Sequence, residues 1–258
     1  MNIQLRYLNP AGNITAVVLT PVQPALRPAL SRAIMAEGRA EQVGFAAPPQ
    51  LGGICRLEMM GGEFCGNAVR SYGGLWAVEH GLGKVTIPVE ISGAVKPVPV
   101  MVEPDGIQSY ADMPLPLGMN WITVEDRRYP LILCQGICHL LALEQNPLPA
   151  FLEAARPQLD ALGQEAWGIM FLKEQRLVPA VYVKSTDSLV WESSCGSGSV
   201  AAAWYLAGAN PARQSFHFQE PGGELHVSVR WKDGMMSECF MGGMVGIGSV
   251  EEFCWAGE

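Results

Sequence analysis

Two short motifs built around Cys-Gly constrain the architecture of this chain most strongly. The first is Glu63-Phe64-Cys65-Gly66-Asn67-Ala68, and the second is Glu192-Ser193-Ser194-Cys195-Gly196-Ser197-Gly198. A run of helix-compatible residues follows each motif, over 69–80 and over 200–207. About half of the 258-residue chain separates the two cysteines. Two similar motifs at this spacing, each opening a helix, predict two α+β domains of similar build.

The segments between the motifs support a repeated order of strands and helices. Alternating apolar residues over 3–20, broken by a turn at 9–13, predict a β-hairpin. A helix is expected next, with Pro28 in its first turn and Gly38 at its end. Prolines interrupt the β-branched segment 84–110, which predicts short or edge strands of an antiparallel sheet.

The same order is expected again after a Pro-rich linker at 113–118. The predicted elements are strands near 129–133 and 138–143, a helix near 150–162, strands near 168–172 and 180–184, the helix after Cys195, and a strand-rich tail over 224–255. We therefore expect an N-terminal domain at 1–114 and a C-terminal domain at 119–245, with a final strand at 246–258 that returns to the first domain.

Charge and cysteine content restrict the partners and the compartment. The chain has 17 Lys and Arg against 25 Asp and Glu and no dense basic cluster, which argues against nucleic acid or an anionic membrane as partner. The N-terminus lacks the pattern of a signal peptide, and no apolar run approaches the ~18 residues of a spanning helix. Seven scattered cysteines without a C-x-x-C pair indicate free thiols, and the four histidines lie far apart in sequence, which gives little support for a metal site. We expect a cytoplasmic protein.

Each motif places its cysteine at or beside a helix N-terminus. The unpaired N–H groups and the helix dipole there stabilise a thiolate, so a lowered pKa is expected for both thiols. The amides of residues 66–67 and 196–197 could hold a carboxylate. One such turn alone is more often a buried thiol. Two thiols that face each other, however, can remove a proton from one side of a carbon and return one on the other, as a racemase requires.

These motifs resemble the signatures of the diaminopimelate epimerase family. Residues 63–70 resemble E-x-C-G-N-G-x-R, and residues 194–198 resemble A-C-G-S-G. The Gly12-Asn13 turn is similar to the family's G-N-D-F, and Gly136-Ile137-Cys138-His139 stands where the family has G-N-P-H. The resemblance covers the chain from residue 12 to about residue 207.

The resemblance implies two pseudosymmetric domains, each an antiparallel or mixed sheet around a central helix, with the active site in the cleft between them. It implies racemisation of a small amino acid without pyridoxal phosphate or any other cofactor, with Cys65 and Cys195 as the acid and base. The residues that it implies as binding the substrate are Asn13, Gly66, Asn67, Gly196 and Ser197. Members of the family often dimerise, so the resemblance also allows a homodimer.

Two further candidates each have two interpretations. His139 is placed by the resemblance beside the wall of the active site, and the alternative is a hydrogen-bonded histidine of the core. Glu192 could bind an amino group or tune the pKa of the Cys195 thiol, and the alternative is a carboxylate that stabilises the helix dipole.

Departures from the family pattern point away from diaminopimelate. Arg56 stands where the family has a substrate-binding Asn, Ile137 replaces the Asn of G-N-P-H, and 182–187 replaces the Y-E-R-G segment that holds the far end of diaminopimelate. Losing these partners favours an amino acid with one stereocentre, and histidine is the named candidate because histidine racemases are among relatives with an altered first motif. The alternatives are diaminopimelate epimerase, a phenazine-biosynthesis-type isomerase, whose first motif has C-G-H where this chain has Asn67, and a non-catalytic binder on the same fold.

Overall fold

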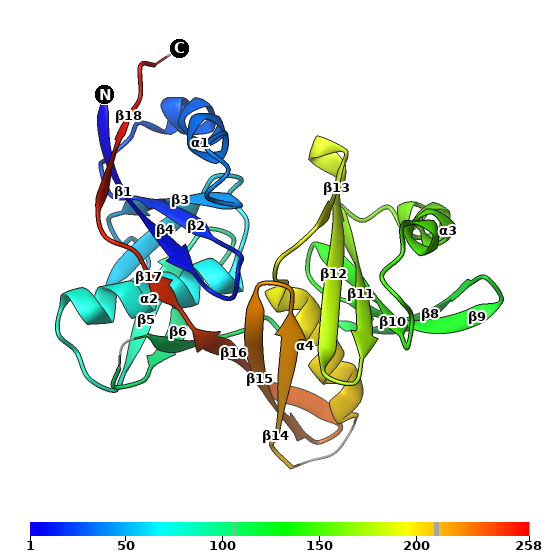
Figure 1. Cartoon of the computed structure of the whole chain (residues 1–258). Helices are drawn as coiled ribbons and strands as arrows, with labels where there is room; N and C mark the ends of the chain where they lie inside the picture. The colour runs from blue at the N-terminus through cyan, green and yellow to red at the C-terminus, as the bar shows by residue number, and fades with distance from the viewer. Residues whose placement is uncertain (106, 209–211, 258) are drawn as a thin grey trace. The chain divides into compact units, whose positions relative to one another are not determined.

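A computed structural model of the chain describes residues 1–105, 107–208 and 212–257 (Figure 1). The chain divides into two compact units, one made of Met1–Asp112 with Gly242–Glu258 and the other of Met113–Met241. Residues 106 and 209–211, which fall within the expected domains 1–114 and 119–245, and residue 258 lie outside the described residues.

The first unit alternates pairs of strands with helices. Its elements are β1 (Asn2–Asn9), β2 (Thr15–Val18), the 3-10 turn η1 (Pro24–Leu26), α1 (Arg27–Met35), β3 (Gln42–Ala47), β4 (Cys55–Met59), α2 (Gly66–Glu79), β5 (Val85–Ile91), β6 (Val98–Val102), β7 (Gln108–Asp112), β17 (Gly246–Ile247) and β18 (Glu251–Cys254). The predicted hairpin at 3–20 and the helix after it are confirmed as β1–β2 and α1. Strands β17 and β18 pair antiparallel with β1, so the two ends of the chain lie side by side in this unit.

The second unit follows the same order. Its elements are β8 (Gly118–Val124), β9 (Arg127–Leu133), β10 (Ile137–Leu143), α3 (Pro149–Asp160), β11 (Ala166–Lys173), β12 (Arg176–Val183), the 3-10 turn η2 (Lys184–Thr186), β13 (Ser188–Trp191), α4 (Gly196–Ala207), β14 (Gln214–Glu220), β15 (Gly223–Lys232) and β16 (Met235–Met244), whose last residues belong to the first unit. The predicted linker ends one residue early, because β8 already begins at Gly118.

One pattern of strand pairing occurs in both units. In the first, β1–β2, β3–β4 and β5–β6 are antiparallel pairs, and β2–β3 and β4–β5 are parallel neighbours. In the second, β9–β10, β11–β12 and β14–β15 are antiparallel, and β10–β11 and β12–β14 are parallel. Parallel neighbours need a crossover connection, and one helix lies within each connection: α1 and α2, then α3 and α4. The units are therefore α+β repeats with mixed sheets, in which α2 corresponds to α4.

The two corresponding helices are buried because small residues let them approach the strands. Helix α2 contacts β1, β4, β5, β6 and β7, and a Cβ atom added at its Gly73 would lie 2.8 Å from Val100 Cγ1. Helix α4 contacts β10, β11, β14 and β15, and a Cβ atom at its Gly198 would lie 2.1 Å from Met170 Sδ. A side chain at Gly73 would collide with the branched Val100, and one at Gly198 would have to displace the flexible end of Met170.

Strand β5 is not an edge strand, although its proline predicts one. It pairs with β4 on one side and with β6 on the other. Pro88 lies directly opposite Pro99 in the antiparallel β5–β6 register. In an antiparallel pair of strands, every second pair of opposed residues does not exchange hydrogen bonds with each other. Residues at such a position donate no N–H to the partner strand, so two opposed prolines fit inside the ladder.

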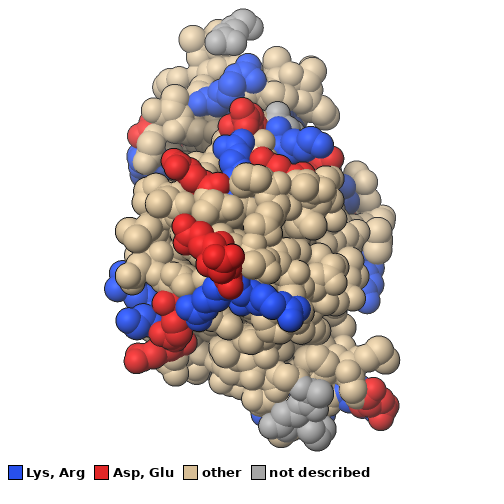
Figure 2. All heavy atoms as spheres, turned by 90° about the vertical axis from the view of Figure 1, so that its right-hand side faces the viewer, with Lys and Arg blue, Asp and Glu red and all other residues tan. Residues whose placement is uncertain are grey.

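Charges of both signs are mixed on the face of the molecule that Figure 2 shows. On the face that Figure 2 shows, basic and acidic side chains are interspersed among uncharged ones, and the described residues of that face form no extended basic patch. No helix within the described ranges is long and apolar enough to cross a membrane.

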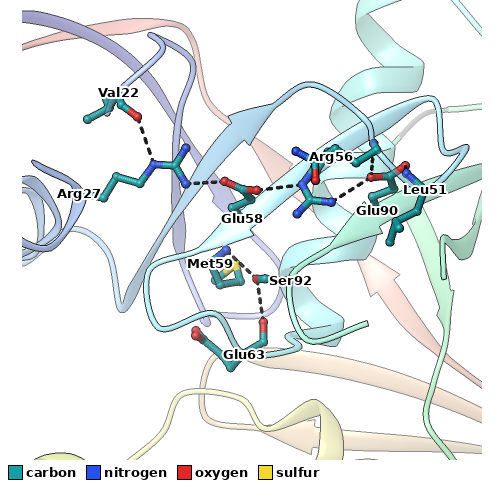
Figure 3. Close-up of polar contacts among 10 residues, drawn as sticks. Val22, Arg27, Leu51, Arg56, Glu58, Met59, Glu63, Glu90 and Ser92 are labelled. Carbon is teal, nitrogen blue, oxygen red and sulfur yellow. Dashed lines mark hydrogen bonds and ion pairs between the residues drawn. The ribbon is translucent and has the colours of Figure 1, made fainter. Parts of the chain in front are cut away.

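A chain of ion pairs fixes the polar side of the first unit (Figure 3). Arg27 of α1 contacts Glu58 of β4, and Arg56 Nε donates to Glu58 Oε1 at 2.9 Å. Arg56 Nη1 donates to Glu90 Oε2 at 3.1 Å. The chain links α1, β4 and β5 through alternating charges, so removing Glu58 takes away the ion-pair partner of Arg27, and removing Arg56 takes away that of Glu90.

Glu90 is the buried end of this chain, with a side chain that is 0% exposed. Its carboxylate also accepts the backbone N–H groups of Gln50 at 2.7 Å, Leu51 at 2.5 Å and Gly53 at 2.9 Å. Burial alone would raise the pKa of Glu90, but these three N–H donors and Arg56 lower it to about 2. The loop before β4 is therefore anchored by one ionised carboxylate.

We predict that Glu90→Gln lowers the melting temperature by several degrees at neutral pH and removes part of the acid sensitivity of the fold. A carboxyl with a depressed pKa stabilises the fold above its unfolded pKa of about 4.3, and this contribution is lost as pH falls toward about 2. Thermal unfolding between pH 7 and pH 2 should therefore show a shallower decline in the variant. The exposed Glu252→Gln is the matched control, and equal acid profiles for the wild type and Glu90→Gln would contradict the prediction.

Candidate functional site

Cys65 caps the N-terminus of α2. Its backbone is extended, with φ −129° and ψ 110°, and its Sγ accepts the N–H of Ala68 at 3.4 Å. Gly66 begins the helix directly after it. The thiol therefore lies where the first N–H groups of the helix have no partner within the helix.

A glutamine from a neighbouring strand completes the surroundings of this thiol. Gln42 Nε2, at the start of β3, lies 3.3 Å from Cys65 Sγ, 2.8 Å from Asn13 Oδ1 and 2.9 Å from Thr15 Oγ1. The amide thus joins the thiol to the turn between β1 and β2. The sequence analysis missed Gln42, because it lies outside both motifs and only the parallel pairing of β2 with β3 brings it to the site.

Asn13 lies beside the Cys65 thiol within the first unit. Its Oδ1 is 4.0 Å from Cys65 Sγ, and its Nδ2 donates to Glu41 Oε2 at 3.1 Å. Asn13 is held at both ends of its amide, by Gln42 and Glu41, which orients it toward the thiol.

The segment before Cys65 is pinned by the turn after β5 (Figure 3). Ser92 Oγ accepts the N–H of Met59 at 2.8 Å and donates to the carbonyl of Glu63 at 3.0 Å. Gly93 has φ +75°, and a Cβ atom there would lie 2.4 Å from the backbone nitrogen of Phe64. Only glycine fits this close approach, so the path of the chain into Cys65 depends on Gly93.

Asn67 turns its side chain into the unit. Its Oδ1 accepts from Arg70 Nε at 3.2 Å, and the buried Arg70 also donates to the carbonyls of Gly243 at 3.0 Å and Met244 at 3.3 Å. With Oδ1 engaged in this way, the backbone N–H of Asn67 is the group that faces the thiol, where it donates toward Cys65.

Cys195 is likewise the N-cap residue of its helix, α4, although within the described ranges its side chain makes no capping hydrogen bond like the one between Cys65 and Ala68. Its backbone has φ −127° and ψ 99°, and Gly196 begins the helix. The Sγ atom lies 3.7 Å from Ser197 Oγ, and Ser197 Oγ lies 2.9 Å from His139 Nε2. The Ser197 hydroxyl therefore connects the Cys195 thiol to the His139 imidazole within the second unit.

His139 is a core histidine that reaches the thiol through Ser197. It is fully buried on β10, and burial lowers the pKa of its imidazole to about 4, which keeps the ring neutral near pH 7. Gly168 on β11 leaves room for the ring, because a Cβ atom there would lie 2.6 Å from His139 Nδ1. His139 can thus orient the Ser197 hydroxyl without carrying charge.

Two carboxylates flank Cys195. Glu220, at the end of β14, accepts the N–H of Cys195 at 2.6 Å and the hydroxyl of Ser199. Glu192 lies at the end of β13, with its backbone N–H bonded to the carbonyl of Pro179 at 3.0 Å. Glu220 was missed from the sequence, because it is 25 residues from Cys195 and belongs to no motif.

Burial raises the pKa of both thiols. For Cys65, desolvation outweighs the N–H donors of Ala68, Gln42 and Asn67, which act to lower the pKa. For Cys195, desolvation and the charges of Glu192 and Glu220 raise the pKa well above its ordinary value, against the lowering effect of Gly198 N–H and Ser197. The predicted lowering of both pKa values is therefore wrong: the helix amides lower them, but burial has the larger effect.

The residues that depart from the family pattern are occupied by internal contacts. Arg56, with a side chain that is 16% exposed, is shared by Glu58 and Glu90. In the segment 182–187, the Tyr182 hydroxyl donates to Asp187 Oδ1 at 2.9 Å, and Arg156 of α3 pairs with the same carboxylate at 3.3 Å. These charges are neutralised within each unit.

Free thiols, as expected, are found at all seven cysteines. Among the described residues, a group of three His, Cys, Asp or Glu side chains with ligand atoms close enough to share a metal ion occurs on β14 and β15, and it includes neither Cys65 nor Cys195.

Solved structures share the fold of this chain. A probable proline racemase from Agrobacterium radiobacter matches with a TM-score of 0.68 at 16% identity, covering 98% of this chain and 93% of that protein. A phenazine biosynthesis protein of the PhzF family from Enterococcus faecalis matches with a TM-score of 0.67 at 14% identity, covering 99% and 100%. At these identities the likeness concerns the fold, a two-domain α+β architecture dominated by sheets.

Sequence comparison identifies a narrower group. A histidine racemase from Fusobacterium nucleatum subsp. nucleatum is 33% identical over 214 residues, which cover 77% of this chain and 79% of the relative. A histidine racemase from Staphylococcus aureus is 28% identical over 247 residues, covering 88% and 89%. The family model described as the histidine racemase CntK N-terminal domain matches residues 2–252. The chain therefore belongs to this histidine racemase family.

Proposed function

We propose that the protein is an amino-acid racemase that inverts the α-carbon of free histidine without pyridoxal phosphate or another cofactor. Cys65 and Cys195 act as the acid and base. The observation that carries the proposal is the repeat of one arrangement: in each unit a cysteine is the N-cap of the corresponding buried helix. The names of the relatives from Fusobacterium nucleatum and Staphylococcus aureus support racemisation and favour histidine as the substrate.

In the proposed reaction, one thiolate removes the α-hydrogen as a proton while the other thiol donates a proton to the opposite face of the same carbon. The electron pair of the C–H bond is held in the carbanion and then forms the new C–H bond, so the product differs from the substrate in configuration alone. The two cysteines exchange roles for the opposite enantiomer. This requires both thiols to be reduced, which favours a reducing compartment such as the cytoplasm.

The helix N-termini supply the electrostatic part of the mechanism. We propose that backbone N–H groups of Gly66, Asn67, Gly196 and Ser197 bind the substrate carboxylate, where negative charge develops as the α-carbon loses its proton. Asn13 and Gln42 border the first thiol, and Ser197 and His139 border the second. Glu192 is proposed to bind the α-ammonium group, since it is a carboxylate close to Cys195.

Raised thiol pKa values suit this reaction once the substrate is bound. A thiolate of high pKa is a stronger base toward a carbon acid, but few molecules carry it near neutral pH. The α-ammonium group of an amino acid brings a positive charge beside the thiols, which lowers their pKa in the complex. Substrate binding would therefore generate the thiolate where it is needed.

We predict that Cys65→Ser and Cys195→Ser each reduce histidine racemisation about 10²–10⁴-fold, because each removes one of the two proton-transfer groups. Racemisation is followed by chiral chromatography of L- and D-histidine in deuterated water, with loss of the α-hydrogen signal measured in parallel. Cys254→Ser, at an exposed cysteine on β18, is the matched control and should keep wild-type activity.

Four outcomes would change the assignment. Racemisation by both serine variants at the wild-type rate would overturn the thiol pair. Exchange with diaminopimelate but not with histidine would make the protein a diaminopimelate epimerase. Absence of exchange with any amino acid would favour an isomerase of the phenazine-biosynthesis type or a binding protein. Dependence of the activity on added pyridoxal phosphate would contradict the cofactor-independent mechanism.

We predict that the thiols of the free enzyme ionise above the ordinary range of cysteine and that bound substrate shifts this ionisation to lower pH. Alkylation of Cys65 and Cys195 by iodoacetamide, followed residue by residue with mass spectrometry, should therefore accelerate only at alkaline pH. The thiol-dependent limb of kcat should lie at lower pH than that of kcat/KM, since kcat reports the complex and kcat/KM the free enzyme.

Glu220→Gln provides a directional test of the same electrostatics. The amide keeps an oxygen to accept the N–H of Cys195 but removes a negative charge that raises the pKa of this thiol. Alkylation of Cys195 should shift to lower pH in the variant, while alkylation of Cys65 stays unchanged. A shift to higher pH, or an equal shift at both thiols, would contradict the assigned role of Glu220.

A further inference from the structure

A separate cluster of ionisable side chains lies on the hairpin of β14 and β15. It consists of His217, Glu224 and His226. In the antiparallel register His217 lies directly opposite His226, and Glu224 precedes His226 by two residues. Directly opposed residues, and residues two apart on one strand, point to the same face of a sheet. The register therefore brings three possible metal ligands onto one face.

The three side chains already converge on one another. Glu224 Oε1 contacts His226 Nε2 and lies 3.5 Å from His217 Nδ1. The two imidazole centroids are 4.1 Å apart. One ligand atom from each residue lies within 4.8 Å of the other two.

A neighbouring amide orients the carboxylate of this cluster. Gln219, the cross-strand partner of Glu224, donates from Nε2 to Glu224 Oε2. Oε1 is left directed at the two imidazoles. Hydrogen bonds of this kind, made by the second oxygen of a carboxylate, are typical of residues that ligate metals.

We propose that His217, Glu224 and His226 form a binding site for a divalent first-row transition metal ion, with zinc as the reference ion. Two imidazole nitrogens and one carboxylate oxygen are a donor set that zinc accepts, with a fourth position left for water or another ligand. Copper and nickel also bind imidazole, whereas magnesium and calcium prefer oxygen donors.

The side chains have room to reach metal-binding distances. Ligand bonds of about 2.0–2.2 Å in a tetrahedral site place the donor atoms about 3.4 Å apart. Glu224 Oε1 lies 3.5 Å from His217 Nδ1 and closer than this spacing to His226 Nε2, and the three donor atoms lie within 4.8 Å of one another. The three side chains are between 30% and 50% exposed, so small rotations can bring the donor atoms to this spacing without moving the core. The bound ion would replace the hydrogen shared between Glu224 Oε1 and His226 Nε2.

The site would cross-link the strands of a hairpin whose turn contacts the Cys195 segment. Glu220 accepts the N–H of Cys195, and the N–H of Gly222 donates to the carbonyl of Ser193 at 2.8 Å. His217 and His226 lie on the two strands that lead into and out of this turn. The metal site is independent of the proposed racemase activity, because none of its ligands contacts either thiol in the described structure.

The test is a titration of the reduced protein with zinc, observed through its histidine side chains. In protein labelled with ¹⁵N-histidine, zinc should move the imidazole signals of His217 and His226 and leave those of His80 and His139 in place. The signals are assigned with His217→Gln, His226→Gln and His80→Gln. Unchanged signals of His217 and His226 at zinc concentrations up to about 1 mM would overturn the proposal.

Affinity and stability give the second measurement. Calorimetric titration should show zinc binding weakened at least tenfold in His217→Gln, His226→Gln and Glu224→Gln, and unchanged in His80→Gln, an exposed histidine that stacks on Trp76. Zinc should also raise the melting temperature of the wild type more than that of the three ligand variants. Binding to cysteine thiols is common to all variants and so does not produce this difference. Equal affinity in all variants would mean that the cluster is a surface ion pair alone.

Discussion

The close packing of one buried helix against a mixed sheet determines the position of one cysteine in each unit, Cys65 in the first and Cys195 in the second. Helices α2 and α4 are the crossovers between parallel strands. Glycine at 73 lets α2 approach Val100 more closely than a Cβ atom would allow, and glycine at 198 leaves room for the Met170 side chain against α4. The start of each helix is thereby fixed relative to the strands. Cys65 and Cys195 are N-caps, so their positions follow from helix packing rather than from contacts of the thiols themselves.

The same burial raises the pKa of each thiol, and hydrogen-bond donors around the thiol act in the opposite direction. A thiol enclosed by protein loses solvation of its ionised form, and this effect exceeds the contribution of the helix amides at both cysteines. Around Cys65 the chain provides neutral donors, chiefly Gln42 and the N–H groups of Asn67 and Ala68. These neutral donors lower the pKa of the thiol only in part, and the positively charged ammonium group of a bound amino acid would lower it further. Under the proposed mechanism, substrate binding and ionisation of the base are therefore coupled.

Local patterns were sufficient to predict the repeated elements but not the groups around them. The Cys-Gly turns predicted both helix starts, because capping and helix propensity act over a few residues. Gln42 and Glu220 could not be predicted, since each reaches its thiol through strand pairing with residues far along the chain. Over 84–110 the sequence predicts short or edge strands, and β5 is not an edge strand, because Pro88 and Pro99 face each other at a position where an antiparallel pair does not exchange hydrogen bonds.

The histidines also show that local sequence patterns do not predict contacts made through strand pairing. They appear scattered in sequence, yet His217 and His226 are direct partners in one hairpin, and that proximity follows from the register, which the sequence analysis did not assign. The expected lowering of the thiol pKa values failed for a related reason. A motif reveals the helix amides next to a cysteine, whereas the extent of burial depends on the whole unit.

The surroundings of Cys65 and Cys195 differ in charge, although the two units repeat one fold. Cys65 is bordered by neutral amides and by the charge of Glu63, whereas Cys195 has the charges of Glu192 and Glu220 nearby, and burial raises the pKa of both thiols. Under the proposed mechanism, the additional carboxylate beside Cys195 favours Cys65 as the thiol that ionises first in the free enzyme and Cys195 as the one that retains its proton. Such an asymmetry supplies the single thiolate and single thiol that a two-base racemase needs at the start of a turnover. Identical surroundings would instead give the two thiols equal pKa values and populate the mixed state less. The buried carboxylate of Glu220, which belongs to no motif, thus contributes to the difference between the two thiols on which the proposed chemistry depends.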